Sequence, residues 1–357
     1  MAFVTLNKKS LETNYNYLKN LFKEHDKEWA PVVKMLCGHK QFLEYLLSLG
    51  EEQVCDARLT NLKTIKSINS KVETIYIKPP AKRSIKNIVK YADVSFNTEF
   101  TTIKWLSEEA ENQNKVHRII IMIELGDLRE GILGEHLLEF YKKVFELPNI
   151  KVVGIGANLN CLSGVMPSKD KLIQLSLYEQ LIEAKFGKKI DYVTGGSSVM
   201  IPLLQKQQIP KGVNHFRIGE TLFFGVDLFS NKTIPKMKND VFLLHAEIIE
   251  ITEKPVLPYG DLEENPSGEL LEINPDDYGN THRRAILDIG LLDIATTDFL
   301  IPVDKKLTFI GASSDMLVVD LQDTRKKYKI GDVVSFKMKY MGALRIMNSR
   351  YIEKRLI

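Results

Sequence analysis

Cysteine is scarce in this sequence of 357 residues, and neither sign of charge is in excess. The three cysteines, Cys37, Cys55 and Cys161, have no CxxC spacing, which favours reduced thiols in a cytoplasmic protein over a disulfide framework or a zinc site. Lys and Arg number 49 and Asp and Glu 46, so the net charge of +3 provides no basic footprint. We therefore expect neither nucleic acid nor a membrane as a partner.

Long apolar runs and several catalytic motifs are also absent from the sequence. The first ten residues lack the apolar core of a signal peptide, and the longest aliphatic run, Ile119–Ile123, is far too short to span a bilayer. No GxxxxGK[ST], HExxH or GxSxG pattern occurs, and no expected strand is followed by GxGxxG. The sequence therefore gives no support to a nucleotide cradle, a zinc protease or a hydrolase elbow.

Two kinds of segment alternate up to about residue 225. Short apolar or β-branched runs predict eight buried parallel strands, at Val32–Leu36, Gln53–Asp56, Thr74–Lys78, Val94–Asn97, Arg118–Leu125, Val152–Asn158, Asp191–Thr194 and His215–Ile218. Helical spacing predicts helices between them, including Gln41–Leu49, Leu59–Ile68, Thr101–Asn112, Leu137–Leu147 and Leu172–Phe186. Eight such units predict an α/β fold with a (β/α)8 TIM-like barrel over residues 1–230, and an open doubly wound sheet is the alternative.

The pattern changes after residue 230. Six further strands are expected, at Phe242–Ile251, Arg284–Leu291, Lys306–Gly311, Met316–Leu321, Val333–Tyr340 and Ala343–Met347. Residues 262–279 are rich in Pro, Gly, Asp, Asn and Glu and are expected to form a loop. Residues 231–357 are therefore predicted to form a C-terminal all-β domain.

Barrel enzymes carry their sites at the carboxyl ends of the strands, which draws attention first to Lys34. This lysine lies within the apolar run Val32–Leu36. Burial lowers the pKa of a lysine, and a lowered pKa suits a nucleophilic amine that forms a Schiff base. The alternative is a lysine that extends its ammonium into solvent from a strand end.

Two segments at the ends of the seventh and eighth expected strands could bind an anion. Gly195–Ser198 offers backbone N–H groups and two hydroxyls before a helical stretch, although glycines and a helix N-cap alone would explain it. Arg217–Glu220 closes the eighth strand. Arg217 would keep a pyridine nitrogen beside it unprotonated, because a fixed positive charge disfavours a second one. Arg129, after the fifth strand, is another cation at this rim.

Several of these segments resemble the alanine racemase family. Val32-Val33-Lys34 with Gly38-His39 is similar to the family's signature around the lysine that binds pyridoxal phosphate (PLP), and Leu125–Ile132 resembles its segment with an arginine near the cofactor ring. Gly311–Asp320 is similar to a motif of its C-terminal domain. The similarity runs in order over nearly the whole chain and is greatest to the alanine/ornithine racemase-like subgroup.

The resemblance implies a fold-type III PLP enzyme that acts as an amino-acid racemase and as a homodimer. It implies interconversion of L- and D-amino acids by Cα proton abstraction from an external aldimine, with ornithine or another basic amino acid favoured over alanine. No metal is expected. The resemblance assigns catalysis to Lys34 and Asp315, and cofactor binding to Lys34, Arg129, Asn158, Gly196, Ser197, Ser198, Arg217, Gly219 and Glu220.

The sequence departs from the family at the second catalytic group. The family's tyrosine, which would act on the opposite face of the substrate, is replaced by Leu291. Asp315 is the first candidate to replace it, although it could equally be a turn or cap carboxylate, and Tyr259, Tyr278 and His282 are the other candidates. The competing functions are a PLP-dependent lyase or decarboxylase on the same scaffold and a non-catalytic PLP carrier.

Overall fold

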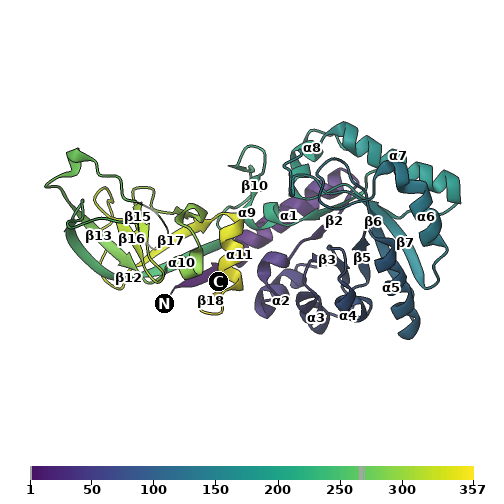
Figure 1. Cartoon of the computed structure of the whole chain (residues 1–357), viewed down its shortest axis with the longest axis horizontal. Helices are drawn as coiled ribbons and strands as arrows, with labels where there is room; N and C mark the ends of the chain where they lie inside the picture. The colour runs from purple at the N-terminus through teal and green to yellow at the C-terminus, as the bar shows by residue number, and fades with distance from the viewer. Residues whose placement is uncertain (1, 265–267, 269) are drawn as a thin grey trace. The chain divides into compact units, whose positions relative to one another are not determined.

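The computed structural model describes residues 2–264, 268 and 270–357. Contacts within the chain divide it into two units, Asn7–Val241 and a second made of Met1–Leu6 and Phe242–Ile357 (Figure 1). This grouping differs from the expected division after residue 230, because the first strand, β1 (Phe3–Leu6), pairs with strands of the C-terminal part. None of the helices in the described part of the chain is long and apolar enough to cross a membrane.

Eight parallel strands form the sheet of the unit Asn7–Val241. Their spatial order is β2 (Glu28–Pro31), β9 (His215–Ile218), β8 (Tyr192–Thr194), β7 (Ile150–Gly156), β6 (His117–Met122), β5 (Val94–Asn97), β4 (Glu73–Tyr76) and β3 (Gln53–Asp56). A parallel bridge between Val32 and Cys55 joins the ends of this order, and the Val33 N–H donates to the Cys55 carbonyl at 2.9 Å. The sheet is therefore closed, as predicted for a (β/α)8 barrel.

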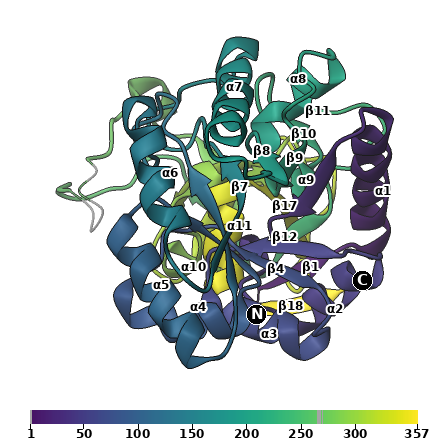
Figure 2. The ribbon, with the colours of Figure 1, turned by 90° about the vertical axis from the view of Figure 1, so that its right-hand side faces the viewer.

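Helices alternate with these strands and surround them in Figure 2. The longer ones are α1 (Lys8–Glu24), α2 (Lys40–Ser48), α3 (Leu59–Ile68), α4 (Ile85–Tyr91), α5 (Phe100–Asn112), α6 (Leu137–Phe145) and α7 (Lys169–Phe186), and the shorter ones are α8 (Ile201–Gln205) and α9 (Glu220–Phe224). Asn7 caps the start of helix α1, and its side chain accepts from the Ser10 N–H at 3.0 Å. Ser168 caps α7 in the same way, and Gly187 ends it in the left-handed conformation.

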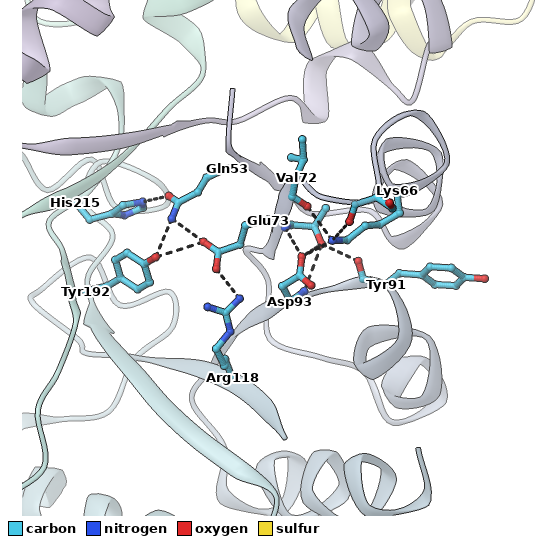
Figure 3. Close-up of polar contacts among 11 residues, drawn as sticks. Gln53, Lys66, Val72, Glu73, Tyr91, Asp93, Arg118, Tyr192 and His215 are labelled. Atoms are coloured by element: carbon cyan, nitrogen blue, oxygen red, sulfur yellow. Dashed lines mark hydrogen bonds and ion pairs between the residues drawn. The ribbon is translucent and has the colours of Figure 1, made fainter. Parts of the chain in front are cut away.

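Ion pairs at the amino ends of the strands stabilise the side of the barrel away from the strand carboxyl ends. The Lys66 ammonium lies 2.5 Å from the Asp93 carboxylate, which also accepts from the Thr74 N–H at 2.8 Å (Figure 3). Thr74 and Asp93 lie at the beginnings of β4 and β5. This cluster fixes neighbouring strands and takes no part in the candidate site described below.

The first barrel strand lies earlier in the chain than predicted. Strand β2 ends at Pro31, and the segment predicted as a strand, Val32–Leu36, contains instead the 3-10 helix η1 (Lys34–Leu36). Val33, Met35 and Leu36 are buried all the same. An apolar run of this length does not by itself distinguish a buried strand from a buried turn of helix, which is why the prediction was wrong.

Antiparallel strands dominate the second unit. The main path of its sheet runs β14 (Leu300–Pro302), β17 (Val333–Met338), β12 (Phe242–Pro255), β13 (Thr281–Leu287), β16 (Leu317–Asp320) and β15 (Thr308–Ala312). Strand β1 extends it by pairing with β12 in antiparallel fashion and with β18 (Glu353–Leu356) in parallel. The predicted C-terminal β domain is confirmed in this form.

One expected strand of this unit is a helix. Ala343–Met347 lies within α11 (Tyr340–Asn348), where Gly342, Ala343, Ile346 and Met347 are buried. These positions are spaced by three and four residues, the repeat of a helix, so the expectation of a strand there was wrong. A shorter helix, α10 (Leu291–Ile294), occupies the position where the family tyrosine was expected.

Candidate active site

Lys34 is the first residue of η1, directly after the carboxyl end of β2. Burial lowers the pKa of its ammonium, and the positive charge of Arg129 acts in the same direction. Cys161, Asp56 and Glu220 oppose that shift. Arg129, Cys161 and Glu220 follow β6, β7 and β9, and Asp56 is the last residue of β3. Lys34 is therefore surrounded by the carboxyl ends of the strands and the loops that follow them.

A sharp turn after η1 fixes the backbone that carries Lys34. Cys37 and Gly38 both have positive φ, at 49° and 76°. A Cβ on Gly38 would lie 2.7 Å from the Asn61 side-chain oxygen. Asn61 is held by its amide, which donates to the Asp56 carboxylate at 3.0 Å, while the Arg58 N–H donates to the same carboxylate at 2.7 Å. Burial raises the pKa of Asp56 to about 6, although these hydrogen bonds act to lower it.

The predicted anion loop, Gly195–Ser198, follows β8 and comes close to the segment after β9. Gly196 has a φ of 143°, and a Cβ there would lie 2.5 Å from the Met200 side chain. The Ser198 hydroxyl accepts from the Thr221 N–H in the first turn of α9 at 3.1 Å. Ser197 begins the 3-10 helix η4 (Ser198–Met200) without a side-chain cap bond. Four of the predicted residues, Gly196, Ser197, Ser198 and Gly219, therefore meet where the two loops join.

Gly219 and Glu220 lie close to the segment that carries Lys34. A Cβ on Gly219 would lie 3.2 Å from Val32, two residues before the lysine. Burial raises the pKa of the Glu220 carboxyl, and the charge of Lys34 opposes that shift. Glu220 is thus a neighbour of the lysine as well as the first residue of α9.

Arg217 is buried in the barrel, with only 2% of its surface exposed. Its guanidinium donates to the Ala157 carbonyl at 2.8 Å, to the Asn158 side-chain oxygen at 2.5 Å, and to both oxygens of Thr194. It also lies 5.1 Å from the centre of the Phe96 ring. Burial lowers its pKa to about 10, which still leaves a cation at neutral pH.

Asn158 connects Arg217 to Arg129 through a residue that the sequence did not single out. The Asn158 amide donates to the Glu130 carboxylate at 2.5 Å, and Glu130 forms an ion pair with Arg129. The predicted residues Arg129, Asn158 and Arg217 therefore form one hydrogen-bonded series, in which Glu130, a residue that was not predicted, connects Arg129 to Asn158. Only the adjacency of Glu130 to Arg129 in Leu125–Ile132 could have indicated it.

A second polar series behind Arg217 was also missed. Thr194 Oγ1 lies 2.9 Å from His215 Nδ1, and His215 Nε2 lies 3.2 Å from the Gln53 side-chain oxygen. The Gln53 amide donates to Glu73 at 2.6 Å (Figure 3). Polar residues inside apolar strand segments, such as His215 and Thr194, were the sequence signal for this series.

The loop after β7 is shaped by Asp127. The two carboxylate oxygens of Asp127 accept from four backbone N–H groups, at 3.1 Å from Cys161, 2.9 Å from Leu162, 3.2 Å from Ser163 and 3.4 Å from Val165. Burial acts to raise the pKa of Asp127, but these four bonds lower it by more. Cys161 is thereby held near Lys34, whose pKa it influences.

The four candidates for the second catalytic group lie in the other unit and do not form one cluster there. Asp315 is exposed in the turn between β15 and β16, where the Ser314 hydroxyl donates to it at 2.7 Å. His282 pairs with Asp320 at the opposite end of the β13–β16 ladder. Tyr259 and Tyr278 are 95% and 70% exposed.

Asp315 does line a pocket of about 740 Å³ within its own unit, together with Asp288, Asp293 and Arg345. The residue that stands in for the family tyrosine, Leu291, begins α10, and its N–H donates to the Ser313 carbonyl at 2.8 Å. Tyr259, Tyr278 and His282 do not line this pocket.

Solved structures of other proteins share this architecture. The crystal structure of alanine racemase from Bartonella henselae, with covalently bound pyridoxal phosphate, matches with a TM-score of 0.75 and 17% identity, covering 100% of this chain and 99% of that one. A match at this identity shows the fold, which is the barrel and β domain of the alanine racemases.

Sequence comparisons identify the family. Residues 6–227 match the alanine racemase N-terminal domain. An ornithine racemase from Acetoanaerobium sticklandii is 37% identical over 99% of both chains, and a lysine racemase from Thermotoga maritima is 31% identical over 98% of this chain and 96% of its own. The chain belongs to the alanine racemase family. The predicted class, a PLP-dependent amino-acid racemase, is confirmed.

Proposed function

We propose that the protein interconverts the L- and D-enantiomers of a basic amino acid, ornithine or lysine, with PLP held on Lys34. The relatives named ornithine racemase and lysine racemase support this substrate class, and both are similar to this chain over nearly its whole length. The observation that carries the proposal is the desolvated amine of Lys34 among the loops that contain the other predicted cofactor residues.

The residues around Lys34 fit this cofactor. At Gly196 an added Cβ would lie 2.5 Å from Met200, and at Gly219 it would lie 3.2 Å from Val32, so both positions favour a residue without a side chain. With Ser197 and Ser198 they would hold the phosphate. Arg217 provides a buried cation for the ring nitrogen, and Arg129 provides a second cation near the lysine.

Each group of this site then has a chemical task. PLP, when bound, supplies the electron sink that stabilises negative charge at the substrate Cα. The Lys34 amine removes or returns the Cα proton on one face, and its lowered pKa increases the fraction of uncharged amine at neutral pH. Arg217 disfavours a proton on the ring nitrogen and thereby favours racemisation over transamination.

Proton transfer on the opposite face requires a second group, and we propose Asp315 for it. Its position on a pocket supports that choice over Tyr259, Tyr278 and His282. We further propose a cytoplasmic homodimer in which the C-terminal unit of one subunit serves the barrel of the other. The thiols of Cys55 and Cys161, which form no disulfide, support a reducing compartment.

The test is proton NMR of the purified protein with PLP and a panel of L-amino acids in D2O. The Cα proton signal of L-ornithine or L-lysine should disappear, and chiral chromatography should then show both enantiomers. Conversion to a keto acid, an aldehyde or an amine would instead indicate a lyase or decarboxylase. Exchange with L-alanine alone would refute the proposed substrate class.

A further inference from the structure

In the hydrogen-bond series behind Arg217, which runs from Glu73 through Gln53, His215 and Thr194, the donor and acceptor of each bond can be assigned. The Glu73 carboxylate at its far end pairs with Arg118 at 2.5 Å and, when ionised, can only accept hydrogen bonds. The Gln53 side chain must therefore present its NH2 group to Glu73, at 2.6 Å, and its oxygen to His215 (Figure 3). Tyr192, whose hydroxyl lies 2.8 Å from the same NH2 group, is compatible with this orientation.

The orientation of Gln53 fixes the proton on His215. Since the Gln53 oxygen is an acceptor, His215 Nε2 must carry the hydrogen, and in a neutral ring Nδ1 is then bare. Burial lowers the pKa of His215 to about 3, and the neighbouring charge of Arg217 acts in the same direction, so the ring is neutral at any working pH. The bare Nδ1 accepts the hydroxyl hydrogen of Thr194 at 2.9 Å.

The orientation of the Thr194 hydroxyl fixes its contact with Arg217. The guanidinium has only donors, so the contact between its NH1 group and Thr194 Oγ1 uses an oxygen lone pair. With its own hydrogen directed to His215, the Thr194 hydroxyl presents that lone pair to Arg217. Among the described residues, no carboxylate forms an ion pair with Arg217, so neutral groups orient this cation and its charge is not cancelled by direct contact.

We propose that His215, fixed as the neutral Nε2–H tautomer by Glu73 through Gln53, is a positioning residue for Arg217. It acts through Thr194 and touches no reacting atom. Its effect on chemistry rests on the proposed function, in which Arg217 faces the cofactor ring nitrogen. The tautomer itself does not depend on that function.

The first test is ¹⁵N NMR of histidine-labelled, full-length protein, with the His215 signals assigned by their loss in His215→Asn. We expect a protonated Nε2 and an unprotonated Nδ1 that do not titrate between pH 5.5 and pH 9. In Glu73→Gln the series loses its fixed acceptor, so the two tautomers should mix. A protonated Nδ1 in the wild type, or titration of this ring near its ordinary pKa, would overturn the proposal.

The second test measures the consequence for Arg217. We compare His215→Leu, which removes both hydrogen bonds, with His215→Asn, whose side-chain oxygen can still accept from Thr194. The readouts are the pH dependence of the bound cofactor's visible absorption and the fraction of turnovers diverted to a keto acid. His215→Leu should raise that fraction by about fivefold, as expected for loss of one hydrogen bond between neutral groups, and His215→Asn should return it most of the way to the wild-type value.

His117→Leu is the matched control for these variants. His117 is also buried at the start of a barrel strand and bonds Ser95 through Nε2 at 2.8 Å, but this contact leads to Asn97 and not to Arg217. His117→Leu should lower stability and leave the product ratio unchanged. Equal effects of His117→Leu and His215→Leu would reduce His215 to a packing role. A wild type that racemises no amino acid would refute the proposed function, while the NMR result would still decide the tautomer.

Discussion

Asp127→Asn should release the loop at residues 161–165 without unfolding the barrel. Each carboxylate oxygen of Asp127 accepts from two backbone N–H groups of this loop. An asparagine keeps one oxygen, so two of the four N–H groups lose their acceptor and face an NH2 group. At about 1.5–3 kcal/mol for each bond to a charged acceptor, the loop loses about 3–6 kcal/mol.

Amide hydrogen exchange measures this loss directly. Since 1.4 kcal/mol corresponds to about a factor of ten, protection of these four amides should fall by about 10²–10⁴ in Asp127→Asn. The loop places Cys161 near Lys34, so the KM for the amino acid should rise as well. Because the pKa of Asp127 is lowered in the folded protein, the same protection in the wild type should persist at neutral pH and fall only as acid protonates the carboxylate, below about pH 4.

Asp227→Asn is the control for this variant. Asp227 makes the same kind of contact in the short hairpin of β10 (Val226–Asp227) and β11 (Lys232–Thr233), where it accepts from the Phe229 N–H at 2.8 Å. Its substitution should leave residues 161–165 protected. Unchanged protection of those amides in Asp127→Asn would show that the carboxylate does not hold the loop and would refute the reasoning.

Three further variants test the site. Lys34→Ala should abolish the cofactor's visible absorption and turnover, whereas Lys27→Ala, which removes another desolvated lysine from the opposite end of β2, should retain both in the same spectra and assays. Arg217→Glu replaces the cation by a carboxylate that favours a protonated ring nitrogen, so keto acid should rise relative to the D-enantiomer by chromatography, and an unchanged ratio would contradict the role of Arg217. In Gly38→Ala, the added Cβ meets Asn61, and the positive φ at this position costs about 1–2 kcal/mol more. The control is Gly50→Ala, where φ is also positive but no atom lies within 4 Å of the added Cβ. The melting temperature should therefore fall further in Gly38→Ala than in Gly50→Ala, and equal shifts would show that the contact with Asn61 is harmless.

The sequence predicted the architecture well because its main signals are local. Runs of four to eight residues separated by helical spacing were sufficient for seven of the eight barrel strands, including His215–Ile218, whose bounds agree. The error at Lys34–Leu36 arose because a buried 3-10 turn has the same composition as a buried strand. Its backbone depends on positive φ at Cys37 as well as at a glycine, and a cysteine gives no warning of that conformation.

The site was predicted only in part, since its interior bonds join residues far apart in the chain. Lys34, Arg129 and Arg217 stood out as charges at strand ends, which is a property of single positions. Glu130 joins the site through a hydrogen bond to Asn158, 28 residues later, and His215 joins it through a hydrogen bond to Gln53, 162 residues earlier. No local pattern in a single sequence contains such a pairing, so these residues became visible only when the strands were assembled.

The two series that meet at Arg217 explain how a barrel can bury a cation and keep it active. One runs through Asn158 to Glu130 and the other through Thr194 and His215 to Glu73, and each carboxylate is also paired with an arginine. A carboxylate in direct contact would stabilise Arg217 more simply, but it would also cancel the positive charge that the proposed function requires at the ring nitrogen. The side chains of Asn158 and Thr194, together with two backbone carbonyls, accept hydrogen bonds from Arg217, and these neutral groups keep the negative charges at a distance. Placing a carboxylate at residue 194, as in Thr194→Asp, should therefore stabilise Arg217 and still raise the fraction of keto acid.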